Sequence, residues 1–304
     1  MKRIATALFA LVVVGMMIAV APAMAQQVIG GHNETSEVNA PLWLVGPPTP
    51  GGVGGHAAAH LLVTEVIVTP TTNELIEIHN PTGATVDLTN YYLTDAWFSP
   101  SAGVFTSYHL LPTGTFTITT NTDFCVRFPA GASIPAGGTQ VIAMYGPGVD
   151  STFGAGTATY EVTSVSPTIP DMINVGNNVP AIGAGATTLT NSSEFAMLFF
   201  WDGVSDNVCD VDYVTWGALT TTSRVDKTGL SVDGPDGDAI ATSYNPDTPF
   251  AAQSSVAAPG LTFSVARLPG FEGAEAPGGN GCIPGGPTPT ERSTWGKVKT
   301  IYRN

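Results

Sequence analysis

Two groups of aspartates offer the clearest chemistry in this sequence. The stretch DGPDGD places Asp233, Asp236 and Asp238 within six residues on a Gly-rich turn. A second group lies upstream and consists of Asp202, Asp206 and Asp210. Calcium prefers hard oxygen ligands on a flexible loop, although neither group fits the helix-flanked loop of the commonest calcium motif. The interpretation of Asp233, Asp236 and Asp238 as calcium ligands therefore stands beside a simpler one, in which a solvated acidic loop keeps the protein soluble.

The histidines give no comparable pattern, since most of them lie near turns or close to the N-terminus. His56 and His60 are four residues apart, which on a helix would place both on one face as zinc ligands. The Gly-Gly-Val-Gly-Gly run before them argues against a helix. The sequence also lacks the motifs of a serine-hydrolase elbow, a phosphate-binding loop and a dinucleotide site. We therefore predict that the chain is not an enzyme and that calcium is its sole candidate cofactor.

The N-terminal segment has the pattern of an export signal. Residues 1–25 begin with Lys2 and Arg3, continue through an apolar run and end in Ala-Met-Ala, which is typical of a signal-peptidase site. Residues 26–59 contain frequent Gly and Pro, which predicts a flexible leader. No later stretch reaches the roughly 20 apolar residues that a membrane span needs. We expect a protein that is secreted, or held in the periplasm or cell envelope, without a membrane span.

The charge of the chain excludes one class of partner. Without residues 1–25, 8 basic residues stand against 24 acidic ones, a formal charge of −16. So acidic a chain repels phosphate backbones, and we therefore expect no nucleic-acid partner. Residues 289–304 form a basic tail, which either docks on the acidic domain or serves as a sorting or partner-binding segment.

The body of the chain reads as an all-β domain. The 35 Gly and 24 Pro indicate many turns, while 43% hydrophobic residues make the chain too apolar for disorder. No dozen residues show a convincing helical period, which argues against crossover helices and a parallel sheet. Two long intervals, 146–191 and 219–253, are expected to contain minor strands or to form recognition loops. Apolar runs of strand length, bounded by turn residues, occur at 61–69, 74–80, 85–94, 105–111, 115–120, 139–145, 194–202, 211–216 and 261–268.

Three successive segments have the pattern of strands, namely Thr64-Glu65-Val66, ELIEIHN at 74–80 and VDLTNYYLTD at 86–95. They resemble the first three strands of the lamin-tail domain in its bacterial, exported form, and the resemblance covers residues 60–288. Weaker similarity continues through IPAGG, FFWDG and, near the end, Ser264-Val265-Ala266-Arg267. The resemblance implies an immunoglobulin-like antiparallel β-sandwich, here with long loops, and no catalytic apparatus.

A structural role is predicted for the carboxylates of the first strands. In an alternating strand Glu77 shares a face with Leu75 and His79. If this carboxylate is buried it needs a donor, because an unpaired buried carboxylate is very costly. Arg267, in the segment that resembles the closing strand of the family, can hold a carboxylate by two hydrogen bonds. We predict that Arg267 lies within salt-bridge reach of Glu77 or Glu65.

Three cysteines in an exported protein suggest one disulfide and one spare thiol. Cys209 and Cys282 lie in turn-like sequence, whereas Cys125 lies in a strand-like run. Loops adapt more easily to disulfide geometry, which favours Cys209 with Cys282, although all three pairings stay open.

Together these features predict an exported, non-enzymatic structural or protein-interaction module of the cell envelope or extracellular space. Its partner would be a protein or a surface glycan, contacted through the two long loop intervals. The alternative is a calcium- or carbohydrate-binding module of the adhesion type. Trp43, Trp97 and Phe98 stand beside Gly, Pro and Ser and are candidates for stacking on sugar rings, or for local packing.

Overall fold

The computed structural model describes residues 60–97, 107–118, 123–175 and 189–266, except positions 222, 245, 248, 254 and 262, together with the backbone of 283–287. The predicted signal peptide, leader and basic tail lie outside these residues.

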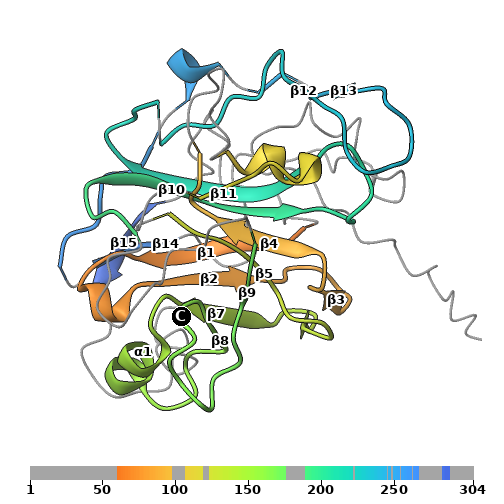
Figure 1. Ribbon diagram of the computed structural model, residues 1–304. Helices are drawn as coiled ribbons and strands as arrows, with labels where there is room; N and C mark the ends of the chain where they lie inside the picture. The colour runs from red at the N-terminus through yellow and green to blue at the C-terminus, as the bar shows by residue number, and fades with distance from the viewer. Residues whose placement is uncertain are drawn as a thin grey trace, which may run out of the picture.

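Two large sheets make up the body of the molecule (Figure 1). Neighbouring strands are antiparallel throughout both sheets, apart from the parallel pair β7 and β8. The first sheet has the order β15 (Ile283–Pro287), β14 (Phe263–Ala266), β1 (Leu62–Ile67), β2 (Leu75–His79), β7 (Thr139–Ala143) and β8 (Tyr160–Glu161). The second has the order β11 (Cys209–Gly217), β10 (Ser193–Phe200), β4 (Tyr91–Thr94), β5 (Cys125–Arg127) and β9 (Ile173–Asn174). The remaining strands of the described residues form two short ribbons, namely β12 (Ser231–Val232) with β13 (Thr242–Ser243), and β3 (Val86–Asp87) with β6 (Ser133–Ile134).

The main core lies between the two sheets. Ile76 of β2 and Val265 of β14 belong to the same buried cluster as Leu93 of β4, Leu198 of β10 and Trp216 of β11. Burial of these large apolar side chains is the dominant favourable term in folding. The predicted fold class, an immunoglobulin-like antiparallel β-sandwich with long loops, is confirmed.

Strand β10 is buried on both of its faces. Its sequence SEFAMLFF sends Ala196 and Leu198 into the main core, while Phe195, Met197 and Phe199 join a second cluster on the outer face of the sheet. The 3-10 helix η4 (Tyr108–Thr113) and the ribbon β12–β13 cover this outer face, in the upper part of Figure 1. An unbroken apolar run is expected of a strand covered on two sides.

A short helix covers the outer face of the first sheet, at the lower edge of Figure 1. The helix, α1 (Gly146–Phe153), packs Val149 and Phe153 against Ile67 and Leu75. These two helical residues are four apart and share one face, but eight residues are too few to give the sequence a recognisable helical period. No helix in the described residues has both the length and the hydropathy needed to cross a membrane.

The expectation of a strand at 105–111 was wrong. Residues Tyr108–Thr113 form η4, which ends at Gly114 with a positive φ of 69°. Pro112 lacks the backbone donor that a strand interior uses, and glycine supplies the left-handed turn. The described part of 115–120, residues 115–118, is likewise not a strand.

The two long intervals contain minor elements, as predicted. Interval 146–191 includes α1, β8 and β9, and interval 219–253 includes β12, β13 and the 3-10 helix η5 (Phe250–Ala252). A further 3-10 helix, η3 (Thr71–Asn73), joins β1 to β2. The segment after β11 therefore folds over the second sheet and carries the aspartate-rich loop with it.

Candidate functional site

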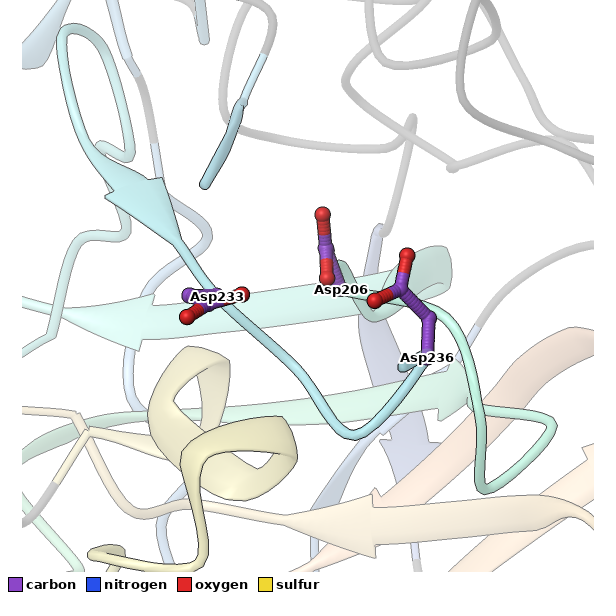
Figure 2. Close-up of side chains that lie close together, drawn as sticks. All are labelled: Asp206, Asp233 and Asp236. Carbon is purple, nitrogen blue, oxygen red and sulfur yellow. The ribbon is translucent and has the colours of Figure 1, made fainter. Parts of the chain in front are cut away.

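Three aspartates from two separate loops converge on one point of the surface (Figure 2). Asp206 lies in the loop between β10 and β11, and Asp233 and Asp236 lie in the loop between β12 and β13. One carboxylate oxygen of each residue lies within 4.8 Å of the others. Asp206 is buried, whereas Asp233 and Asp236 are exposed, so the group opens to solvent on one side. This arrangement is the candidate metal site.

Asp206 fastens the two loops together. Its Oδ1 accepts a hydrogen bond from the backbone N–H of Gly234 at 2.8 Å, and its Oδ2 accepts one from the hydroxyl of Thr242. The hydrogen bond from Thr242, followed by that from Gly234, lowers the pKa of Asp206, so the carboxylate is charged at neutral pH. Gly234 is needed at this approach because a Cβ there would lie 2.7 Å from the Cα of Asp206. The close packing of Gly234 against Asp206 therefore fixes the relative position of the two loops.

The two carboxylate oxygens of Asp206 can still bind a cation after they have accepted their hydrogen bonds. Each carboxylate oxygen has two lone pairs, and the two bonds to Asp206 use one on each oxygen. Calcium takes about six to eight oxygen ligands at about 2.3–2.6 Å, from carboxylates, carbonyls and water. Asp206, Asp233 and Asp236 can supply three of them, and the open side of the group admits water.

The structure groups a different set of aspartates from the predicted one. Asp238 does not join the group, because its Oδ1 accepts the backbone N–H of Ile240 at 2.8 Å and closes a local turn. Asp206 takes its place, although sequence spacing had assigned it to a different group. Asp202, of the same group, accepts the N–H of Val204 at 2.9 Å and that of Ser205 at 2.7 Å, and so also closes a turn.

The third member of the upstream group, Asp210, belongs to a buried network that the sequence did not reveal. Lys227 is fully buried, and its Nζ contacts Oδ2 of Asp210 and lies 2.8 Å from Oδ2 of Asp247. The hydroxyl of Tyr108 donates a hydrogen bond of 2.8 Å to Oδ1 of Asp210. The one sequence signal is that Lys227 is an isolated lysine within an acidic, apolar body.

Burial and charge oppose each other around Lys227. Burial alone lowers the pKa of Lys227, but the attraction of Asp210 and Asp247 outweighs it and raises the pKa above its ordinary value. Burial raises the pKa of Asp247 in spite of the neighbouring ammonium. Nζ also lies 5.9 Å from the ring centroid of Tyr108 and 5.8 Å from that of Tyr244, within cation–π range.

Glu77 is fully buried in β2, which is the case in which its carboxylate needs a donor. Thr64 donates its hydroxyl hydrogen to Oε1 of Glu77. Glu65 lies opposite Glu77 across the β1–β2 ladder and opposite Ala266 across the β1–β14 ladder. Arg267 follows Ala266 but lies outside the described residues, so its ion pair with Glu77 or Glu65 stays a prediction.

The cysteines and the candidate sugar-binding aromatics are only partly described. Cys209 is buried at the start of β11 rather than in a turn, and Cys282 lies outside the described residues, so their pairing stays a prediction.

Trp97 is 3% exposed and packs against Tyr108 and His109 with centroid distances of 6.1 and 5.3 Å. The alternative of local packing therefore holds for Trp97. Trp43 and Phe98 lie outside the described residues.

The chain has a distant structural neighbour. It is similar to a DUF4876 family protein from Bacteroides thetaiotaomicron, at 13% sequence identity and a TM-score of 0.35. The match covers 54% of this chain and 56% of that chain, so the chain spans little more than half of the neighbour's length. No protein-family model and no curated protein matches the chain. The resemblance to the lamin-tail domain stays a prediction.

Proposed function

We propose that the chain is an exported, non-enzymatic structural or protein-interaction module of the cell envelope or extracellular space, of the lamin-tail type. The layering of the fold supports this proposal. The outer face of the first sheet packs against α1, and that of the second packs against η4 and the β12–β13 ribbon. Loops rather than sheet faces are then the surfaces that a partner meets.

One observation carries the proposal, namely that Asp206 joins the β10–β11 loop to the β12–β13 loop. The joined loops present two exposed apolar side chains, Val204 at 55% exposure, two residues before Asp206, and Ile240 at 73% exposure, four residues after Asp236. A surface that combines apolar contact area with fixed charge suits a protein partner. The rigid attachment of the loops also lowers the entropy lost on binding.

A capture experiment tests this surface. The purified protein is immobilised and exposed to the native secretome, beside the double variant Val204→Ser/Ile240→Ser. The double variant is expected to lose the bound protein, whereas Leu261→Ser, at 63% exposure just before β14 and outside both long loop intervals, is expected to retain it. Equal capture by all three proteins would show that the joined loops are not the recognition surface.

A second candidate function is calcium binding by Asp206, Asp233 and Asp236, in an adhesion-type module whose partner is a protein or a surface glycan. The convergence of the three carboxylates within 4.8 Å supports it. An ion that binds the folded state alone stabilises it by about 2.7 kcal/mol at a concentration 100 times Kd.

Thermal unfolding with and without millimolar calcium tests this candidate. The melting temperature is expected to rise with calcium, and the rise should vanish in Asp233→Asn/Asp236→Asn. Asp238→Asn is the matched control, because this residue shares the loop but not the group. An unchanged melting temperature in the unmodified protein would contradict the calcium-binding function.

A further inference from the structure

The buried lysine is positioned for a reaction rather than only for an ion pair. The side chain of Lys227 is 1% exposed, and its Nζ touches one oxygen of Asp210, so the carboxyl carbon of Asp210 lies one bond beyond the contact. Oδ2 of Asp247, the third member of the group, lies 2.8 Å from Nζ. A nucleophile held against an acyl carbon in a water-excluded site has the advantage of proximity.

The charges of this site favour a neutral product. Lys227, Asp210 and Asp247 carry a net charge of −1 when all are ionised, and each buried ion loses its hydration. Joining the ammonium and a carboxylate as an amide removes two of these three charges from the interior. The free energy of desolvation therefore drives the site towards the condensed state.

The neighbouring groups have the positions that such a condensation needs. The Tyr108 hydroxyl donates to Oδ1 of Asp210 at 2.8 Å, which is the oxygen that gains negative charge when the carbon is attacked. Asp247 Oδ2 accepts hydrogen bonds from both Nζ and the backbone N–H of Lys227, the latter at 2.7 Å. Its Oδ1 has no hydrogen-bond partner among the described residues. Asp247 is therefore fixed beside Nζ with a free oxygen for proton transfer.

We propose that Lys227 and Asp210 form an intramolecular amide, an isopeptide bond, with Asp247 as the proton-transfer group and Tyr108 as the donor that stabilises the oxyanion. The bond links β11 to the segment that leads into β12, across 17 residues of chain. It fastens the covering layer, and with it the loop that holds Asp233 and Asp236, to the second sheet.

The reaction balances without an oxidant or a second substrate. A proton first moves from the Nζ ammonium to Oδ2 of Asp210, which gives an amine and a carboxylic acid. The nitrogen lone pair then attacks Cγ, and the carbonyl electrons move to Oδ1, where the Tyr108 hydroxyl stabilises them. Asp247 takes a second proton from the nitrogen and passes it to Oδ2 of Asp210. Oδ2 leaves as water, the carbonyl at Oδ1 re-forms, and Asp247 returns to its starting state.

Mass spectrometry of the reduced, denatured protein tests the bond. The unmodified chain is expected to be lighter than its sequence by the mass of one water. Trypsin cannot cleave after an acylated lysine, so residues 128–224 and 225–267 should appear as one linked species. Loss of water at an Asp-Gly step, such as Asp233-Gly234, is distinguished because it maps within 225–267 and links nothing.

Two variants separate the chemistry from the fold. Lys227→Met removes the nucleophile, and Asp247→Asn keeps the nucleophile and Asp210 but removes the proton-transfer group, so both should have the full sequence mass. The result on the unmodified protein decides the proposal even where a variant fails to fold. A full sequence mass for the folded, unmodified protein would overturn it, and a link mapped to Asp247 would overturn the choice of Asp210.

Discussion

The backbone N–H of Val63 in β1 donates a hydrogen bond of 2.7 Å to Oδ2 of Asp212 in β11. The two strands belong to different sheets, so this contact ties the two layers together through the core. The β1–β2 ladder shifts register between Val63 and Glu65, and the bond is buried. Asp212 thus satisfies a backbone donor at a point where the ladder is irregular.

Replacing Asp212 by Ala is expected to destabilise the fold by about 1–3 kcal/mol, because a buried N–H loses its acceptor. Asp212→Asn retains an acceptor oxygen and should lose less. Urea unfolding of both variants measures the difference. A midpoint for the Ala variant equal to that of the unmodified protein would mean that this bond contributes nothing to stability.

The pH dependence of stability should reflect buried carboxyl groups. Burial raises the pKa of Glu194 to about 8, although the backbone N–H of Thr190 favours the charged form. Because the folded pKa lies above the unfolded one, the contribution to stability is complete below the unfolded value of 4.5 and is lost as pH rises through about 8. The free energy of unfolding is expected to fall by a few kcal/mol across this window, since one pKa unit is about 1.4 kcal/mol.

Asp95 adds to the same trend. It is 2% exposed, and burial, followed by the charge of Glu194, raises its pKa well above the ordinary value. Glu194→Gln should therefore reduce the fall in stability, and Glu194→Gln/Asp95→Asn should reduce it further and leave the part that comes from Asp247, whose pKa burial also raises. Urea unfolding at a series of pH values is the measurement, and an undiminished fall in the double variant would contradict this assignment.

A double-mutant cycle tests the predicted pairing of Glu77 with Arg267. Breaking a buried ion pair from one side costs about 3–5 kcal/mol, because the other charge is left uncompensated. Glu77→Gln and Arg267→Met should each destabilise the protein, and together by less than their sum. Arg224→Met serves as a control, since this side chain is partly exposed and bonds to a backbone carbonyl. Additive effects for Glu77 and Arg267 would point to Glu65, for which the same cycle is then run.

Thiol chemistry tests the predicted disulfide. Cys125 is buried in β5, and burial raises the pKa of its thiol, so it should resist alkylation until the protein unfolds. A non-reducing peptide map is expected to link Cys209 to Cys282. A link that includes Cys125 would replace the predicted pairing with one of the other two.

Several strands could be read from the sequence because their signal is local. The run 74–80 corresponds to β2, and 194–202 corresponds to β10, within two residues at each end. In β2 the β-branched residues Ile76 and Ile78 carry this signal, and in β10 an unbroken apolar run of strand length carries it. The error at 105–111 arose because Tyr108, Leu110 and Leu111 suit a strand and a buried 3-10 turn equally well.

The sequence by itself determined a turn-rich, all-β chain, because strand periodicity, glycine and proline act over a few neighbouring residues. Only the tertiary structure decided which residues each buried aspartate contacts. Asp206 meets Gly234 across 28 residues, and Tyr108 meets Asp210 across 102. Such meetings depend on how the covering segments pack on the second sheet, and spacing along the chain carries no measure of that distance.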